Sequence, residues 1–248
     1  HRYWEKEWQG NRKPGGIGMT DFNDIGISRQ LDWERIKKLL AIGFFSALLS
    51  FTGDMLLGWG IEDETLTGLS RMLSAYTGIS DIGLFVIAMT GMIAVTLMGL
   101  CCFGIYRLMA EKAPAYAHWY KNGIFGFVIF DGCGFHVPVC ALVYLAKHLG
   151  WTELVQNFSS SFLMPAFWLF WVFFLMMQAM QIMAFAKGMT PCPKWGLLLS
   201  LPVGMAAVKL LVVFGNRPWV NALNCAWIGF GGMWMVGGLL VTLRKMQI

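Results

Sequence analysis

The segment FDGCGFHVP, residues 130–138, lies inside an otherwise apolar run over residues 123–146. A run of this length is enough to cross a membrane as a helix, which takes about 20 mostly apolar residues. Asp131 and His136 therefore fall within a predicted membrane span. Ionisable side chains are costly there, and they mostly face the interior of a helix bundle, where they serve function. The segment thus predicts a helical membrane fold and a candidate functional position inside it.

The composition of the whole chain supports a membrane protein. Of its 248 residues, 57% are hydrophobic and only 13% are charged, whereas a soluble domain carries about 25% charged residues. The net charge of +5 comes from basic residues at the ends of the apolar runs, so it needs no nucleic acid to explain it. We predict an all-α, polytopic membrane protein of the cell membrane, with no nucleic-acid partner.

Six apolar segments are long enough to form a six-transmembrane-helix bundle. They cover residues 39–59, 82–108, 123–145, 162–186, 195–214 and 220–243. Lys and Arg collect in the N-terminal segment and in alternate connections, while the other connections are acidic or nearly neutral. The positive-inside rule then places both termini in the cytoplasm.

These spans divide the chain into three predicted parts. Residues 1–38 form a polar cytoplasmic tail with an interfacial helix, residues 39–243 the transmembrane domain, and residues 244–248 a short cytoplasmic tail. Met19 has the form of a natural start, which would make residues 1–18 a tail or an upstream addition.

The depth of the polar side chains in these spans predicts an outward-facing pocket between spans one, three, five and six. Its members are Asp54, His136, Lys209, Asn221 and Asn224, with Arg217 at the mouth. A carboxylate beside an ammonium group lowers the cost of burying both charges, and an imidazole titrates near neutral pH and can move protons. We therefore predict that His136 acts as general acid or base and that Asp54 orients it or activates water. Lys209 and the two asparagines would hold a polar head group.

A second polar station is predicted closer to the cytoplasm. Asp131 and His136 are five positions apart, which is about 140° around an α-helix, so they do not share one narrow face. Gln178 and Gln181 are three positions apart and share a face of span four. We assign Asp131 to a station with these two glutamines.

Each of these residues also has a structural interpretation. Asp54 could cap a neighbouring helix, Lys209 could extend its long stem toward water, and His136 could be a satisfied core histidine. Asn221 and Asn224 could be hydrogen-bond partners at a helix end, and Asp131 could form a structural contact with the amide of Gln178 or Gln181.

Cysteine spacing and short motifs argue against cofactor chemistry. The six cysteines lie mostly within the spans, and none forms a C-x-x-C pair. Zinc-protease and serine-hydrolase motifs do not occur. We predict no metal and no cofactor. Five glycines between residues 229 and 238 of the last span allow close helix contact, which makes homo-oligomers through Gly-rich faces an expectation.

Three short stretches carry a resemblance to a known family. They are GDMLLG at residues 53–58, GFHVP at residues 134–138, and Pro202 in the fifth span followed by Trp219-x-Asn221. With these stretches the chain resembles an uncharacterised family of bacterial six-helix integral membrane proteins, from Leu39 onward. The resemblance implies a shared architecture and a shared site. The Gly53-Asp54 ending of the first span is also faintly similar to lysoplasmalogenase-type membrane hydrolases.

The function expected from the predicted pocket is a small membrane enzyme that acts on a lipid-like or amphipathic substrate by acid/base chemistry, as a lipid hydrolase or isomerase. Its partner would be a membrane lipid or an amphipathic small molecule. The alternatives are a non-catalytic small-molecule binding protein, a proton-coupled transporter that uses Asp54, Asp131 and Lys209, or a structural subunit of a membrane complex. A polar path from Asp54 through Asp131 to Gln181 would favour transport.

Overall fold

The computed structural model describes residues 31–246, which form helices and short connections and contain no strand. The all-α membrane fold is thus confirmed over this range. Most of the predicted N-terminal tail lies outside the described residues. The helix that was predicted to lie at the interface is continuous with the first span, because α1 begins at Trp33.

Five helices in the described part of the chain are long and apolar enough to cross a membrane. Three of them are single α-helices, and the third and fourth in chain order are continuous helices that contain π-helical segments. The elements are α1 (Trp33–Leu57), α2 (Gly68–Ser74), α3 (Asp81–Ala110), α4 (Pro114–Phe127), η1 (Val128–His136), α5 (Val137–Leu149), α6 (Glu153–Phe158), η2 (Ser159–Leu163), α7 (Met164–Ala186), η3 (Lys194–Leu198), α8 (Leu201–Lys209), η4 (Leu210–Phe214), α9 (Pro218–Cys225) and α10 (Trp227–Lys245).

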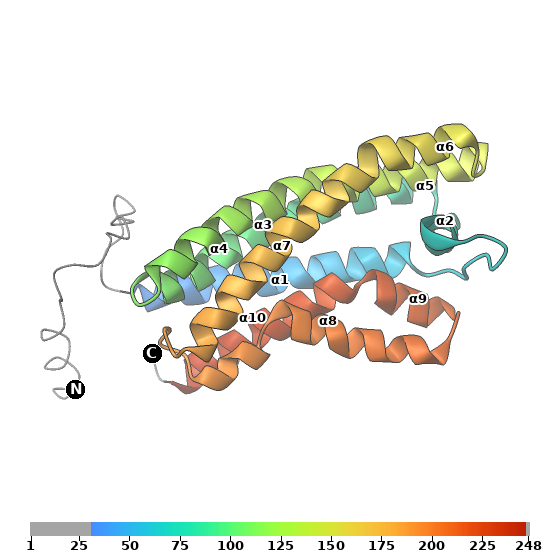
Figure 1. The fold of residues 1–248 in the computed structure, drawn as a ribbon. Helices are drawn as coiled ribbons and strands as arrows, with labels where there is room; N and C mark the ends of the chain where they lie inside the picture. The colour runs from blue at the N-terminus through green and yellow to red at the C-terminus, as the bar shows by residue number, and fades with distance from the viewer. Residues whose placement is uncertain (1–30, 247–248) are drawn as a thin grey trace, which may run out of the picture.

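The fifth predicted span, residues 195–214, is not one long helix. It consists of η3 and a separate apolar helix, Leu201–Phe214, which is formed by α8 and η4. Pro202 stands in the first turn of α8, where proline starts a helix but cannot continue one from the preceding residues. Because the Leu201–Phe214 helix is shorter than the others, the described residues support five full membrane crossings. Figure 1 shows that α8 nevertheless lies alongside α10, with its axis along the length of the bundle like those of the long helices.

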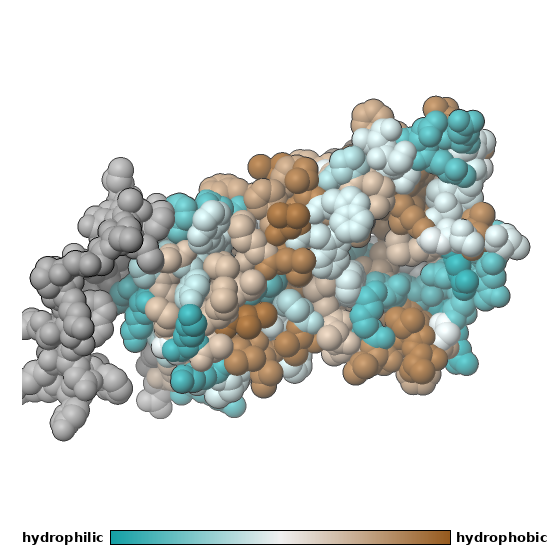
Figure 2. Space-filling view, viewed as in Figure 1, coloured by the Kyte–Doolittle hydropathy of each residue, from teal (hydrophilic) through white to brown (hydrophobic). Residues whose placement is uncertain are grey.

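The ends of the long helices are defined by caps and turns. The Asp32 carboxylate accepts a hydrogen bond from the backbone N–H of Arg35, and the Ser80 hydroxyl accepts one from that of Gly83. Such side chains satisfy backbone donors that the first turn of a helix leaves unpaired. In Figure 2, hydrophilic surface gathers toward the two ends of the bundle and hydrophobic surface across its middle, as expected for a membrane protein.

Close helix packing depends on glycines. α1 packs against α3 and α10, and α4 packs against α7. Cys101 Sγ lies only 2.1 Å from the position that a Cβ on Gly43 would take, and the Phe173 ring lies 2.0 Å from that of Gly126. The glycines of the last span also meet atoms of their own chain, since Gly231 faces the backbone of Leu201. These surfaces therefore pack within the bundle.

Gly229 gives a stability prediction. A Cβ at this position would lie 2.6 Å from the backbone nitrogen of Phe51, and backbone cannot move aside as a flexible side chain can. We expect Gly229→Ala to lower the free energy of unfolding by about 1–3 kcal/mol, measured as a fall in Tm by tryptophan fluorescence in detergent. Gly53→Ala is the matched control, because the nearest atom, Thr90 Oγ1, is 3.7 Å away. An equal loss of Tm in both variants would contradict the prediction.

Candidate functional site

Buried apolar side chains form two separate cores along the bundle. The first lies in the half where α10 ends, and the second in the half that holds α2 (Figure 1). Along α1 the first core ends at Ala47 and the second begins at Leu57. Along the continuous helix Pro114–Leu149, which consists of α4, η1 and α5, the first core ends at Phe127 and the second begins at Val139. A layer without buried apolar residues on these two helices therefore separates the cores.

Polar side chains occupy this interval, which we call the polar layer and define as Ser50, Asp54, Asp131 and His136. Asp54, Asp131 and His136 are buried. Buried polar groups are retained in a membrane bundle where they are paired or functional. The polar layer is thus the part of the structure in which to look for a site.

One face of α1 carries hydroxyl and carboxyl groups at regular spacing. Ser46, Ser50 and Asp54 are four residues apart and therefore line up along one side of the helix. The Ser50 hydroxyl donates to Asp54 Oδ2 at 3.4 Å, and the Ser46 hydroxyl donates to the backbone oxygen of Ala94 in α3. The row leads from the middle of the bundle toward the end that holds α2.

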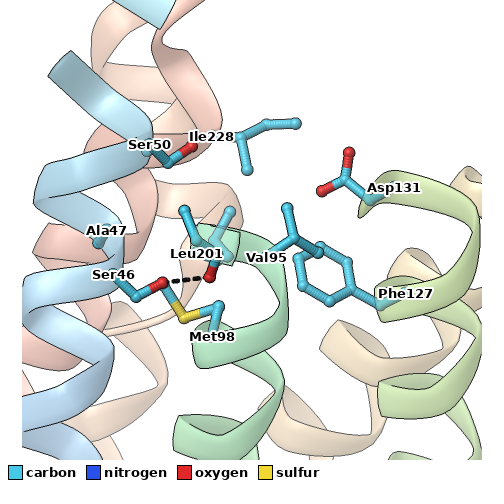
Figure 3. Close-up of a pocket in the computed structure, with 11 residues that line it drawn as sticks. Ser46, Ala47, Ser50, Val95, Met98, Phe127, Asp131, Leu201 and Ile228 are labelled. Atoms are coloured by element: carbon cyan, nitrogen blue, oxygen red, sulfur yellow. Dashed lines mark hydrogen bonds between the residues drawn. The ribbon is translucent and has the colours of Figure 1, made fainter. Parts of the chain in front are cut away.

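Asp131 projects from η1 toward this row, across a small cavity (Figure 3). The cavity of about 20 Å³ is lined by Ser46, Ser50 and Asp131, and by apolar residues of α3, α8 and α10. That volume is enough for one water molecule. Asp131 is 2% exposed and lies within electrostatic range of Asp54. Within residues 31–246 neither carboxylate forms an ion pair.

Tyr76, Cys140 and Cys225 also lie within electrostatic range of the Asp54 carboxylate. Tyr76 lies in the connection between α2 and α3, outside the membrane-spanning helices. Burial raises the pKa of its hydroxyl well above the usual value. The hydroxyl therefore keeps its proton at physiological pH and can donate a hydrogen bond toward the site.

The π-helix η1 corrects the predicted separation of Asp131 and His136. Hydrogen bonds in a π-helix join residues five apart, so these two residues are offset by about one turn and not by the angle of an α-helix. Both belong to the side of η1 that faces α3: Asp131 lines a cavity with Val95, and the His136 ring packs against Gly91, four residues earlier. They occupy one polar layer and not two stations.

His136 does not join the carboxylates through hydrogen bonds. Its Nδ1 is buried without a partner, and within the described residues no hydrogen bond links its ring to Asp54. A Cβ on Gly91 would lie 2.7 Å from Nδ1, so the absence of a side chain at Gly91 makes room for the ring. The predicted contact by which Asp54 would orient the imidazole is not present.

The predicted contact of Asp131 with the glutamines of α7 is also absent from the described part of the chain. There the amide atoms of Gln178 and Gln181 are buried and have no hydrogen-bond partner. Both side chains lie in α7, in a region filled by the aromatic residues of the first core. A buried amide without a partner lowers stability.

The predicted head-group residues lie at the α9 end of the bundle. The Lys209 ammonium group donates to Asn224 Oδ1 and lies 3.9 Å from the centroid of the Trp227 ring. The Asn221 amide donates to the backbone oxygen of Gly60 at 2.9 Å. Arg217 immediately precedes α9.

Asn216 binds the amide of Asn221 and both backbone groups of Glu62. The two asparagines therefore tie together two connections that are distant in the sequence. Lys209 also lies within electrostatic range of Cys225.

Several site residues were missed in the sequence. Ser46 and Ser50 were not selected because single serines are common in membrane helices, yet their spacing of four residues from each other and from Asp54 was visible. Tyr76 was not selected either, because nothing in the local sequence indicates that it lies within electrostatic range of Asp54. Within residues 31–246 no group of three or more His, Cys, Asp or Glu residues has the geometry of a metal site.

Residues 22–246 match the model of a family of unknown function, DUF6796. The chain belongs to this family. The match covers all of the long helices and the polar layer. Comparisons with curated proteins and with solved structures give no match. The predicted membership of an uncharacterised family is confirmed.

Proposed function

We propose that this protein is a proton-coupled membrane transporter in which Asp54 and Asp131 bind the coupling proton. The observation that carries the proposal is the electrostatic proximity of these two buried carboxylates: Asp131 lines the small cavity together with Ser50, and Ser50 donates a hydrogen bond to Asp54. Within residues 31–246 neither carboxylate has a compensating cation. Two carboxylates in an apolar surrounding do not both stay ionised, because each negative charge disfavours the other. Carboxylates in this setting take up and release protons in pumps and transporters.

The two apolar cores supply the barriers that such a mechanism needs. The polar layer lies between them, so a proton on the carboxylates is separated from each end of the bundle by packed side chains. The Ser46–Ser50–Asp54 row and the Tyr76 hydroxyl extend from the layer toward the α2 end. A cavity for one water is too small for a solute, so solute binding would require α1 and η1 to separate.

We further propose that the protein crosses the cell membrane six times with both termini inside. Support comes from the Leu201–Phe214 helix, which runs alongside α10, and from the distribution of basic residues. Lys187, Lys194, Arg244 and Lys245 all follow or precede helices at the end where α10 stops. The positive-inside rule assigns that end to the cytoplasm.

Infrared spectroscopy of the protein in nanodiscs tests the protonation of the pair. We expect the wild type to show a protonated-carboxyl band near neutral pH, where exposed Asp and Glu side chains are ionised, and to lose it at alkaline pH. The double variant Asp54→Asn/Asp131→Asn should lack this band. Asp63→Asn is the control: Asp63 is exposed, and hydrogen bonds from Thr65 lower the pKa of its carboxyl group, so this variant should keep the band. A band that survives in the double variant would overturn the proposal.

A lipid-like substrate defines a second candidate, a membrane hydrolase or isomerase that uses His136. The unpaired, buried Nδ1 of His136 favours it, because an imidazole nitrogen without a partner is available for proton transfer. Hydrolysis of lysophospholipids that is lost in His136→Gln and kept in Asp131→Asn would support this candidate over the transporter.

A further inference from the structure

An apolar groove of about 390 Å³ lies on the outside of the bundle, away from the polar layer. Its walls come from η3 and the residues before α8 on one side and from α10 on the other. It is lined by Trp195, Leu199, Trp234, Gly237, Gly238 and Val241. Trp195 and Val241 are both about half exposed, so the groove opens toward the surrounding membrane.

The groove is preformed by two features of α10. Gly237 and Gly238 place no side chain on its floor, and Gly238 allows Leu199 to pack against the helix backbone. The Trp234 indole N–H donates to the backbone oxygen of Leu198 at 2.8 Å, which holds the ring as a fixed wall. The shape therefore needs no rearrangement to accept a chain of methylene groups.

Basic side chains stand at one end of the groove. Arg244 and Lys245 follow Val241 by three and four residues, so they continue the same face of α10. Lys194 directly precedes Trp195. All three basic residues are exposed, and within residues 31–246 none forms an ion pair. No acidic residue follows Glu153 in the sequence, so nothing nearby along the chain neutralises them.

We propose that this groove binds an anionic phospholipid of the membrane, with an acyl chain along α10 and the phosphate held by Lys194, Arg244 and Lys245. The charge of the three side chains selects an anionic head group over a zwitterionic one. The apolar, half-exposed walls match an acyl chain, which reaches the groove laterally from the bilayer. The polar layer takes no part in this site.

Native mass spectrometry of the detergent-purified full chain tests the proposal, with dioleoyl phosphatidylglycerol and dioleoyl phosphatidylcholine as probes. We expect the wild type to retain phosphatidylglycerol preferentially. The triple variant Lys194→Gln/Arg244→Gln/Lys245→Gln should lose that preference by about tenfold or more, since three basic residues near a lipid head group are removed. Val241→Trp, at an exposed position, should lower binding of both lipids by filling the groove.

The matched control removes the same charge elsewhere at this end of the bundle. Lys37→Gln/Lys38→Gln/Lys112→Gln should bind phosphatidylglycerol as the wild type does. Equal retention of the two lipids by the wild type, or an equal loss in both triple variants, would overturn the proposal. A dimer of the chain that disappears in Val241→Trp would also overturn it, because a second copy would then occupy the groove.

Discussion

Asp131→Asn is expected to abolish proton-coupled transport while the protein still folds. The substitution keeps the shape of the side chain and removes its ability to bind and release a proton. Because Asp131 forms no ion pair in the described part of the chain, its neutralisation leaves no buried charge unpaired. Loss of a positioned proton-transfer group lowers rates by about 100-fold or more.

The measurement uses proteoliposomes that contain a pH-sensitive dye. Panels of amines, amino acids, sugars and nucleosides are added outside, and solute-dependent proton movement is followed for the wild type and for the Asp131→Asn variant. Asp63→Asn again serves as control and should transport as the wild type does. Solute-driven proton movement at the wild-type rate in Asp131→Asn would contradict the role of the carboxylate pair. The Tm of the variant, which should stay near that of the wild type, separates a lost function from a lost fold.

Gln178→Met and Gln181→Met are each expected to stabilise the protein. Methionine has nearly the shape of glutamine and no amide, so the substitution removes buried donors and acceptors that have no partner. The cost of leaving such groups unsatisfied is about 1–3 kcal/mol, and we expect each substitution to recover roughly 1 kcal/mol or more of it. The measurement is the increase in Tm in detergent and in the denaturant concentration at half-unfolding.

Gln156→Met is the matched control for these variants. Gln156 is exposed in α6, and its amide donates to the backbone oxygen of Trp151 at 3.3 Å. Methionine at this position should leave the Tm unchanged or slightly lower. If Gln178→Met and Gln181→Met lower the Tm instead, the two amides have partners in the membrane-embedded protein.

The helical class and most of the spans were predictable because the length of an apolar run is a local property. The third predicted span is an example, since residues 123–145 fall inside Pro114–Leu149. The break in residues 195–214 was less clear, because a proline within a span can kink a helix or start a new one. At Pro202 it starts one, after the turn that follows η3.

The candidate site was predicted only in part because its geometry depends on packing. Asp54, Asp131 and His136 stood out as costly residues in apolar sequence, and all three lie in the polar layer. Their grouping depended on the angle between Asp131 and His136, which changes when the helix is π and not α. No local pattern distinguishes these two helix types, because the wider turn forms where α3 and α7 pack against it. Lys209 was grouped with Asp54 by depth alone, whereas its side chain turns toward Asn224 and Trp227.

The π-helix η1 has one further consequence, which concerns registry. Relative to an α-helix, a π-turn holds a surplus residue, and that surplus can migrate along a helix without a break in the chain. If the surplus moved past Asp131 toward α4, the Asp131 carboxylate would rotate away from Ser50 while α5 and the second core kept their places. Such a local slip of hydrogen bonds would change access to the carboxylate without rigid movement of whole helices.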